Sequence, residues 1–384
     1  MASSDSYADV VVVGAGIAGA SVAAELAASR RVVLLEREAQ PGYHTTGRSA
    51  ALYSPTYGPP AIRALTRASA AFFRDPPAGF AAHALLRPRK VLTVADAASA
   101  GAIAAAYAEV KGRSDVAPIS GEEARRLMPL LRPEHSVAAL LESDAADIDV
   151  HALHHGYLRQ MKEQGGVLET AAEVRALIRT GDGWQVETAR GIWRAPVLVN
   201  AAGAWADELA ALAGVATVGL TPKRRTALIV DGPDGRVDDD WPMVVAADEA
   251  FYMKPDAGRL FLSPADETPS APCDAQPEEI DVAICIDRIE RAFDFPVKRV
   301  LNKWAGLRSF VADKTPVVGF APDTPGFFWL AGQGGYGIQS APAVSRLAAA
   351  LVMGEGLPAD IAGEGGAFAD LAPGRGGLGG EKAQ

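Results

Sequence analysis

A glycine-rich turn between two short apolar runs constrains this chain more than any other feature of its sequence. Residues 8–13 read ADVVVV, an apolar, β-branched run that is typical of a buried parallel strand. Three glycines follow at once with the spacing G-x-G-x-x-G, and the Ala-rich stretch 20–29 favours a helix. A second buried strand is expected at 32–35 and ends at Glu36. These residues predict one strand–helix–strand unit of about 30 residues.

The spacing of Gly14, Gly16 and Gly19 is the one that dinucleotide-binding turns require. The first glycine permits a tight turn, the second lets backbone N–H groups reach a pyrophosphate, and the third lets the helix pack closely on the strand. Glu36 lies about 20 residues further on, where a carboxylate can bind a ribose hydroxyl. The unit predicts a dinucleotide cofactor, and by itself it leaves FAD and NAD(P) open.

Two later turns favour FAD. Small residues at 199–205 end an expected strand, and the Gly-rich stretch 332–337 follows another strand and opens a helix. A flavin dinucleotide is long and its ring must be held against the substrate, so it needs several such contacts. We therefore expect FAD as the cofactor.

The chain between these turns changes character, which predicts two structural parts. Helices are expected at 62–73, 150–163, 205–213 and 280–293, and a last helix is expected from the Gly-rich stretch 332–337 to residue 353. Strands are expected at 167–170, 174–179, 184–188 and 193–200. Ser120 and Glu123 have the spacing of a capping box. From 221 to 300 strand-like pieces dominate, which is typical of a more antiparallel region.

This order of elements predicts an α/β fold with a discontinuous cofactor domain. We expect a Rossmann-like FAD-binding domain made of residues 1–80, 143–216 and 313–365. An inserted, mainly antiparallel α+β substrate-binding domain is expected at 81–142 and 217–312. Residues 366–384 are rich in Gly, Ala and Pro and are expected to form a disordered tail.

Charge and cysteine content exclude several classes of function. The net charge is −10, so phosphate backbones and anionic lipid surfaces are poor partners, and no nucleic acid is expected. Cys273 and Cys285 form no C-x-x-C motif, so neither a metal site nor a disulfide framework is expected. No apolar run is long enough for a transmembrane segment, and residues 1–9 lack the pattern of a secretory signal. The expected compartment is the cytoplasm.

Three stretches resemble one known family. They are GYHTTGRSAA at 42–51, WAGLRSF at 304–310 and GQGGYGIQ at 332–339. The chain is similar to the D-amino acid oxidase-like flavoproteins, which include sarcosine and glycine oxidases, over nearly its whole length apart from the tail. Within that family, the run LEREAQPGYH at 35–44 resembles the bacterial D-arginine dehydrogenases.

The resemblance implies which residues hold FAD. Gly14, Gly16, Ala18, Gly19, Glu36 and Arg37 would bind the adenosine and pyrophosphate; Arg48, Ser49 and Ala50 would pass the isoalloxazine; Val174 would meet the adenine through its backbone, Gly203 would approach the cofactor closely, and Gln339 would lie by the flavin. No cysteine stands after Arg308 where sarcosine oxidases attach their flavin, so non-covalent FAD is expected.

The resemblance also implies a site for an amino acid substrate. Arg225, Tyr252 and Arg308 would bind its carboxylate, the carbonyl of Gly335 would accept from its amine, and Tyr57 would belong to a mobile loop over the site. The planar guanidinium of arginine grips a carboxylate with two parallel hydrogen bonds. The implied reaction is hydride transfer from Cα of a D-amino acid to the flavin, which leaves an imino acid that water hydrolyses to a 2-oxo acid and ammonia.

Two positions depart from the pattern of the arginine-selective relatives. Val91 stands where those relatives carry a glutamate, and Leu52 stands where a histidine is expected. An apolar residue cannot compensate a buried guanidinium, so apolar or uncharged substrate side chains are expected instead. Asp248 or Glu249 could supply a negative charge from elsewhere.

Several alternatives stay open at this point. They are an oxidase of amines such as glycine or sarcosine, a flavoprotein for 2-hydroxy acids, and a non-catalytic assembly factor. The electron acceptor, a quinone or another carrier, is not defined by the sequence. His44 is expected in a loop on the cofactor side rather than as a general base. His151, His154 and His155 are expected to be surface or packing residues.

Overall fold

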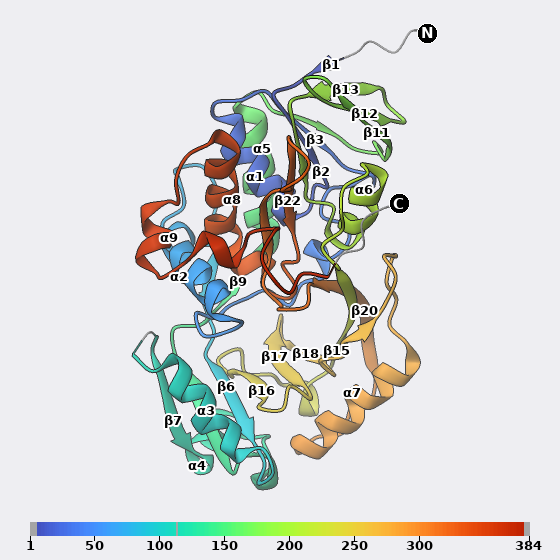
Figure 1. Cartoon of the computed structure of the whole chain (residues 1–384). Helices are drawn as coiled ribbons and strands as arrows, with labels where there is room; N and C mark the ends of the chain where they lie inside the picture. Colours follow the sequence, from blue (N-terminus) through green and yellow to red (C-terminus); the bar gives the residue numbers. More distant parts are fainter. Residues whose placement is uncertain (1–5, 113, 380–384) are drawn as a thin grey trace.

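The computed structural model describes residues 6–112 and 114–379. Within them the chain folds into two parts (Figure 1). A mostly parallel sheet between a helical layer and a smaller sheet forms one part, and a large, mostly antiparallel sheet flanked by helices forms the other. This α/β architecture is the fold class that the sequence predicts.

The parallel sheet has six strands in the described residues. In spatial order they are β10 (Val167–Glu169), β3 (Val32–Leu35), β2 (Val10–Val13), β14 (Val197–Asn200), β22 (Phe327–Ala331) and β21 (Val317–Phe320). All neighbours run parallel except β21 and β22. Every residue of β2 and β3 is buried, because both faces of this sheet are covered.

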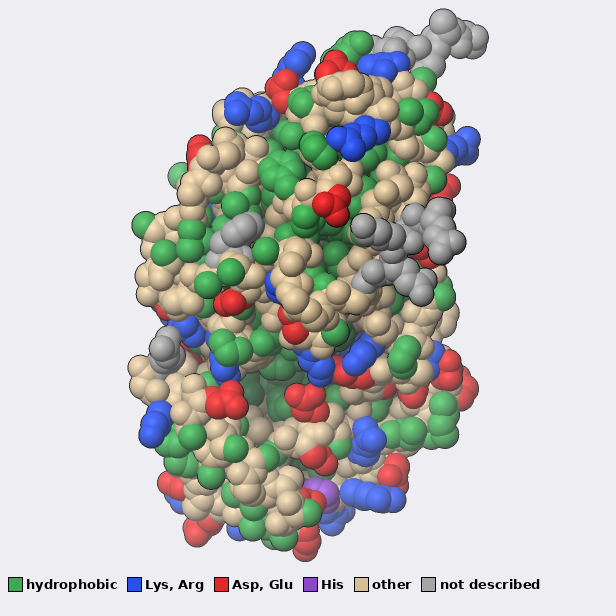
Figure 2. All heavy atoms as spheres, viewed as in Figure 1, with side chains coloured by type: hydrophobic (Ala, Val, Ile, Leu, Met, Phe, Trp, Pro, Cys, Tyr) green, Lys and Arg blue, Asp and Glu red, His purple; other side chains and the backbone are tan. Residues whose placement is uncertain are grey.

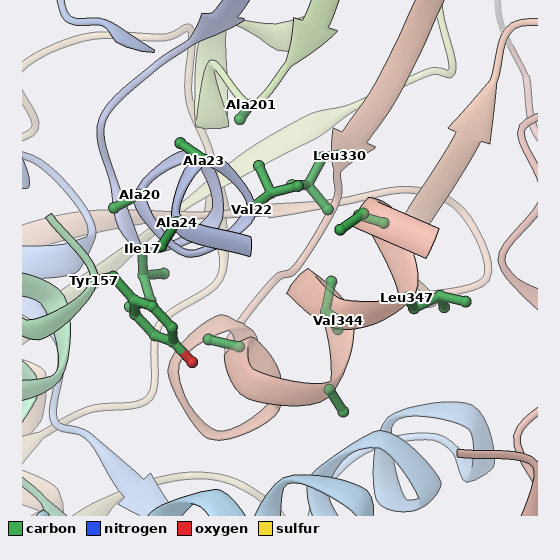
Figure 3. Packing of buried hydrophobic residues seen from close by; sticks show 14 of the residues in the cluster. Ile17, Ala20, Val22, Ala23, Ala24, Tyr157, Ala201, Leu330, Val344 and Leu347 are labelled. Carbon is green, nitrogen blue, oxygen red and sulfur yellow. The ribbon is translucent and has the colours of Figure 1, made fainter. Parts of the chain in front are cut away.

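Helices cover one face of the parallel sheet. They are α1 (Ile17–Ala27), α5 (Val150–Glu163), α8 (Gly337–Met353) and α2 (Pro60–Arg74). Figure 3 shows the small side chains of α1, such as Ala20 and Ala24, among larger side chains of the neighbouring elements, such as Tyr157 and Val344. The Ala-rich sequence lets α1 approach α5 and α8 closely, so helices and strands bury one continuous core.

A four-stranded sheet covers the other face. Its order is β1 (Ser6–Tyr7), β13 (Ile192–Ala195), β12 (Gly183–Thr188) and β11 (Val174–Thr180). The prediction of one strand over 193–200 was wrong, because the chain divides at Pro196 into β13 and β14, which belong to different sheets. Proline has no N–H to donate to a ladder, so it suits the change from one sheet to the next.

The second part is built on a nine-stranded sheet. Its main order is β19 (Thr268–Pro269), β15 (Thr221–Val230), β18 (Arg259–Ser263), β17 (Tyr252–Asp256), β16 (Met243–Ala246), β6 (Val91–Ala95), β8 (Ala138–Glu142) and β7 (Val116–Ser120), and β20 (Val300–Phe310) pairs with β15. Among these pairs only β16 and β6 run parallel. The sheet thus joins two stretches that are far apart in the sequence.

Helices α7 (Glu279–Ala292), α3 (Ala100–Val110) and α4 (Gly121–Leu127) pack on this sheet. The expected capping box at the start of α4 is present: Ser120 Oγ accepts from the backbone N of Glu123, and the carboxylate of Glu123 accepts from the backbone N of Ser120. A small antiparallel sheet, β4 (Leu52–Tyr53), β9 (Ala146–Ile148) and β5 (Leu86–Pro88), lies where the chain passes between the two parts.

Shorter elements complete the described chain. They are α6 (Ala206–Leu212), α9 (Ala359–Gly363) and the 3₁₀ turns Thr46–Arg48, Pro133–His135, Gly203–Trp205, Pro233–Gly235 and Phe368–Asp370. No helix within the described ranges has the length and apolar character needed to cross a bilayer. On the face shown in Figure 2, acidic and basic side chains are interspersed.

The segment after α9 packs on the body of the protein. Leu371 is buried, and its carbonyl accepts from Val318 N at 2.8 Å. Arg375 donates from Nε to Asp313 Oδ2 at 2.7 Å. The expected disordered tail is therefore wrong for residues 366–379, since few but well-placed contacts order a Gly-rich segment. Residues 380–384 of that expected tail lie outside the described residues.

Candidate active site

A cavity of about 400 Å³ opens between the two parts. Val13, Leu35 and Ala201 line it where β2, β3 and β14 end, and Tyr252 and Arg308 line it from the large sheet. Ligands of open α/β sheets bind outside the carboxyl ends of the parallel strands. The cavity therefore lies where the sequence places the cofactor, and it continues to the expected substrate residues.

Glycines shape the turn at the cofactor end. Gly14 has a φ of +101°, and a Cβ there would lie 2.4 Å from the carbonyl oxygen of Ala201. A Cβ at Gly19 would lie 1.8 Å from the carbonyl oxygen of Gly14, so this glycine serves helix packing and does not line the cavity. Gly16 precedes α1 without a side-chain cap. Ile17 N is bonded to the side chain of Thr46, and the other N–H groups of the first turn of α1 are available for a pyrophosphate.

Backbone hydrogen bonds hold Glu36 at the cavity wall. Its Oε2 accepts from Ala15 N and its Oε1 accepts from Glu38 N, both at 2.9 Å. The side chain is buried and lines the cavity. A carboxylate has about four lone-pair positions, so each oxygen of Glu36 keeps capacity for a ribose hydroxyl.

Two side chains support this turn that the sequence reasoning did not assign to it. Thr46 Oγ1 accepts from Ile17 N at 3.0 Å and thereby caps α1 from another segment. His154, in α5, is buried and its Nε2 lies 2.9 Å from the carbonyl oxygen of Ala15, to which it donates. Burial lowers the pKa of His154 to about 4. The packing role expected for this histidine is confirmed.

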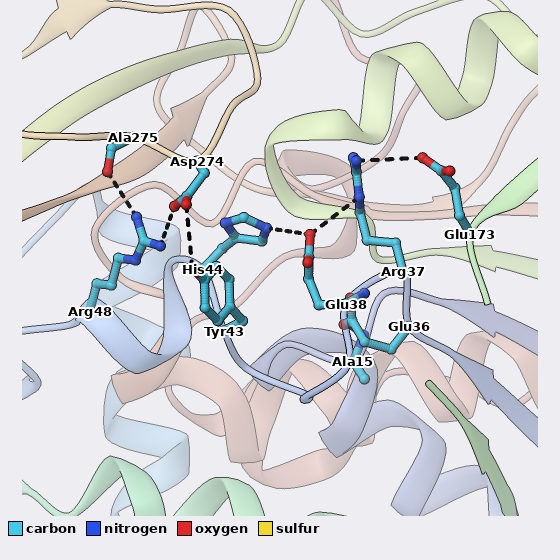
Figure 4. A network of polar contacts seen from close by, with 10 residues as sticks. All are labelled: Ala15, Glu36, Arg37, Glu38, Tyr43, His44, Arg48, Glu173, Asp274 and Ala275. Carbon is cyan, nitrogen blue, oxygen red and sulfur yellow. Dashed lines mark hydrogen bonds and ion pairs between the residues drawn. The ribbon is translucent and has the colours of Figure 1, made fainter. Parts of the chain in front are cut away.

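A polar network forms the rim of the cofactor end (Figure 4). The guanidinium of Arg48 donates to the carbonyls of Ala275 and Ala305, both at 2.9 Å, and pairs with Asp274. The guanidinium is therefore used by the second part of the molecule, and the remainder of Arg48 lines the cavity. The sequence does not indicate that Asp274 and Ala275 are partners of Arg48, because both lie more than 200 residues from it.

On the other side of the rim, His44 Nε2 lies 3.0 Å from Glu38 Oε1. Arg37 contacts Glu38 and Glu173 at 3.4 Å each, and it stacks over the ring of Trp205. His44 lines the cavity in this network, in the cofactor-side loop where it is expected. The other lining residues expected for the cofactor are Ala18, Ser49, Ala50, Val174 and Gly203.

Gln339 differs from the expectation that it lies by the flavin. Its side chain is buried in α8 and does not line the cavity. Its Oε1 accepts from Ser54 N at 3.1 Å and its Nε2 donates to Tyr57 O at 3.4 Å. It thus holds residues 54–57, which we call the Tyr57 segment.

Arg308 is the most distinctive group at the substrate end. It lines the cavity from β20, and no carboxylate of the described residues pairs with it. Its Nη1 donates to Tyr57 Oη at 3.3 Å. Burial opposes the charge, but the phenols of Tyr57 and Tyr252 more than offset this and raise the pKa of Arg308. Among residues 6–112 and 114–379, no carboxylate therefore neutralises the guanidinium of Arg308.

Gly335 makes room for that cation. A Cβ at this position would lie 2.8 Å from Arg308 Nη1, so the absent side chain lets the guanidinium rest against the backbone. Arg225 differs from Arg308, because it donates to the carbonyl of Asp266 at 2.8 Å and pairs with Glu267 at 3.3 Å. The structure brings Arg225 and Arg308 to one cavity but leaves only Arg308 without a counter-charge in the described chain.

The wall beside the two arginines is apolar. Tyr252 and Phe261 line the cavity and stack with ring centroids 5.9 Å apart. They share a buried cluster with Val91, Leu52 and Met243. Val91 and Leu52, the two departures noted in the sequence, are thus brought together behind the cavity.

Comparison with known proteins supports this assignment. The model of the family "FAD dependent oxidoreductase" (DAO) matches residues 9–351. Glycine oxidase of Geobacillus kaustophilus is 25% identical over 62% of each chain. Its crystal structure superposes with a TM-score of 0.81 at 22% identity, covering 91% of this chain and 96% of that one.

Other relatives match over less of their own length. Dimethylglycine dehydrogenase of Mus musculus is 25% identical over 63% of this chain and 30% of the mouse protein. FAD-dependent oxidoreductase domain-containing protein 1 of Xenopus laevis is 28% identical over 42% of this chain and 35% of its own length. These findings support the family-level resemblance and not the narrower one to D-arginine dehydrogenases. With a cavity shaped for a dinucleotide and a family match over most of its length, the chain belongs to the DAO family of FAD-dependent oxidoreductases, and FAD is its cofactor.

Proposed function

We propose that the chain oxidises the Cα–N bond of a D-amino acid. A hydride passes from Cα to flavin N5, and the imino acid that forms reacts with water to give a 2-oxo acid and ammonia. We also propose the domain division given above, with residues 1–80, 143–216 and 313–365 for FAD and residues 81–142 and 217–312 for the substrate. A cytoplasmic location and a quinone or other carrier as acceptor belong to the same proposal.

The observation that carries the proposal is the unpaired cation of Arg308. Arg308 is partly buried, and a cation that has lost part of its water without gaining a partner is unfavourable, so an anionic ligand that binds beside it removes that cost. The planar guanidinium suits a carboxylate, and Tyr57 Oη, 3.3 Å from Nη1, can donate to the same oxygen atoms. An α-amino acid supplies a carboxylate next to the carbon that reacts.

The residues of this end can orient the substrate without further groups. When bound, FAD supplies the hydride acceptor. Arg308 holds the carboxylate, and the carbonyl oxygen of Gly335 accepts from the amine. Arg225 and Tyr252 flank the carboxylate from β15 and β17. If the amine arrives neutral, the hydride leaves Cα directly and no side-chain base is needed.

The apolar wall supports a preference for apolar side chains. Each methylene buried against Tyr252 or Phe261, which line the cavity in front of Val91 and Leu52, contributes about 0.8 kcal/mol, whereas a cation would lose water without a partner. Behind the wall, Lys254 lies 6.0 Å from the centre of the Phe261 ring and pairs with Asp147 at 2.7 Å, so the carboxylate of Asp147 is already used by this lysine. Glu142 stands opposite Val91 in the ladder between β6 and β8 but does not line the cavity.

An oxidase of a small amine such as glycine or sarcosine is the second candidate. The match to glycine oxidase favours it, and the same Arg308 would bind the carboxylate of either substrate. Oxygen consumption under turnover, with formation of peroxide, distinguishes this oxidase from a dehydrogenase.

Anaerobic bleaching of the flavin by a panel of D- and L-amino acids, glycine and sarcosine tests the proposal. In steady-state kinetics with an artificial acceptor, we expect D-Leu, D-Met or D-Phe to have a higher kcat/KM than D-Arg or D-Lys. Bleaching only by L-amino acids would overturn the assignment to D-amino acids. A tenfold advantage for D-Arg would overturn the argument from the apolar wall.

A further inference from the structure

Two buried side chains that the proposed chemistry does not use hold the Tyr57 segment from behind. Glu142, at the end of β8, accepts from Ser54 Oγ at 2.7 Å and from Thr56 N at 3.2 Å. Gln339 accepts from Ser54 N at 3.1 Å and donates to Tyr57 O at 3.4 Å. Four hydrogen bonds therefore connect this short segment to β8 and α8, two elements far apart in the sequence.

The position of the segment decides where the Tyr57 hydroxyl lies. Tyr57 Oη is 3.3 Å from Arg308 Nη1, and the ring packs edge-on against Tyr336 with centroids 5.0 Å apart. The side chain itself is 39% exposed, so its own packing holds it only in part. The hydrogen bonds to the backbone of the segment therefore help to hold this hydroxyl beside Arg308, although Tyr57 itself is not among the residues that line the cavity.

Glu142 is an unusual residue for such a contact. It is 4% exposed, and no Lys, Arg or His side chain of the described chain pairs with it. Burial raises the pKa of Glu142 to about 7, although the bonds from Ser54 and Thr56 oppose this. At neutral pH the carboxyl is thus divided between its neutral and ionised forms.

The surroundings leave few other groups to titrate. The neighbouring strands β6 and β7 contribute no titratable side chain. The negative charge of Asp144 acts in the same direction as burial. Burial raises the pKa of Tyr53, which precedes the segment, to about 12, so this phenol stays neutral near pH 7. Glu142 is therefore the group here that changes charge near neutral pH.

We propose that Glu142 is a positioning residue for Tyr57 and that opening of the Tyr57 segment is coupled to ionisation of the Glu142 carboxyl. The inference deepens the proposed function and rests on it for the role of Tyr57. Opening removes Ser54 and Thr56 from the carboxyl and lets water reach it. The closed segment binds the proton more tightly than the open one, so proton uptake favours closure and ionisation favours opening.

The size of the effect follows from the two limiting states. With a pKa of about 7 when the segment is closed and the ordinary 4.5 when it is open, the opening equilibrium rises about tenfold between pH 6 and pH 8.5. Hydrogen exchange of the holoenzyme, followed by mass spectrometry over residues 52–58 and corrected for the intrinsic rate, measures this rise.

Glu142→Gln tests the coupling, since the amide has the shape of the neutral acid. Its oxygen can accept from Thr56 N and its NH₂ group can donate to Ser54 Oγ. We expect the tenfold rise to disappear in this variant. We also expect KM to depend on pH across this range in the wild type and not in Glu142→Gln. Ser54→Ala removes one donor from the segment and is expected to raise exchange already at pH 6.

Asp144→Asn is the matched control, because Asp144 lies near Glu142 but makes no hydrogen bond to the segment. It should keep the rise, displaced to slightly lower pH by the lost negative charge. If Glu142→Gln abolishes the rise in hydrogen exchange with pH, the coupling is supported even if no amino acid reduces the flavin. If Glu142→Gln keeps the rise in hydrogen exchange, or if the wild type shows no such rise, the coupling is overturned even if D-amino acids are oxidised.

Discussion

The two ends of the cavity are held in different ways. At the cofactor end, Glu36 and the turn at Gly14 are fixed by backbone hydrogen bonds and close backbone packing. At the substrate end, Arg308 keeps an uncompensated charge and Tyr57 depends on a segment that is bonded from behind. A rigid site suits a cofactor that stays, whereas a site with unmet charge and the opening proposed above for the Tyr57 segment suits a ligand that must enter and leave.

The largest expected effect concerns attachment of the cofactor. Acid precipitation of the holoenzyme should release all of the yellow flavin into the supernatant, because no cysteine lines the cavity. Absorbance of supernatant and pellet measures this. Flavin that stays with the pellet would show a covalent link and contradict the expectation of non-covalent FAD.

Arg308→Ala removes the charge that distinguishes the substrate end. We expect kcat/KM to fall by the equivalent of about 3–5 kcal/mol, the range for one partner of a buried charge pair. FAD content should stay at the wild-type level. Arg299→Ala, at an exposed residue just before β20, is the control and should leave both quantities unchanged. Normal kinetics in Arg308→Ala would remove the central support for the proposed function.

Glu36→Ala is the corresponding change at the cofactor end. It leaves Ala15 N and Glu38 N without their acceptors, at a cost of about 1–3 kcal/mol for a buried group. The dissociation constant of FAD, measured by flavin fluorescence, should rise roughly 10- to 100-fold. The kcat at saturating FAD should change little. A large fall in kcat with unchanged FAD affinity would mean that the two ends are not independent.

Acid should weaken the cofactor end through His154. Its pKa is about 4 in the folded protein against 6.5 ordinarily, so the unfolded chain binds more protons between these values and stability is lost as pH falls through this window. The loss attributable to His154 is about 2 kcal/mol at pH 5 relative to pH 7. Thermal unfolding of His154→Gln should show a difference between pH 7 and pH 5 that is smaller by this amount. An unchanged difference would contradict the role of His154.

Val91→Glu should sharpen the assignment of the apolar wall. A carboxylate in this wall gives a cationic substrate a partner, so kcat/KM for D-Arg relative to D-Leu should rise about tenfold. Val91→Gln has the same shape without the charge and should not change the ratio. The glutamate would also stand opposite Glu142, so some loss of stability is expected.

Sequence reasoning succeeded where the signal was contiguous. The glycine turn, the capping box at Ser120 and the strand pattern depend on neighbours in the chain, and the structure has them. The break at Pro196 and the packing of Leu371 depend on partners that periodicity does not reveal. The hydrogen-bond and ion-pair partners of polar side chains are the hardest to predict, because these contacts form only when segments distant in the sequence come together.

The substrate end illustrates this limit. The family resemblance implied that Arg308 binds the substrate carboxylate, and the structure places Arg308 in the cavity. That Arg225 shares Glu267 with Lys223, and that Gln339 faces the Tyr57 segment rather than the cavity, follows from three-dimensional contacts alone. The sequence therefore predicts which residues gather at this end better than it predicts what each one contacts.

The long ladder between β15 and β20 has a consequence for how such a chain can vary. Arg225 stands opposite Gly306 and Lys223 opposite Arg308, so both arginines are set by one antiparallel register. The irregularity in that ladder lies at Ile229 and Val230, beyond the arginines and toward the far end. The loop 231–242, between the end of β15 and the start of β16, can therefore gain or lose length while the spacing of the two guanidinium groups stays the same. An insertion in this loop leaves the positions of Arg225 and Arg308 in the ladder unchanged.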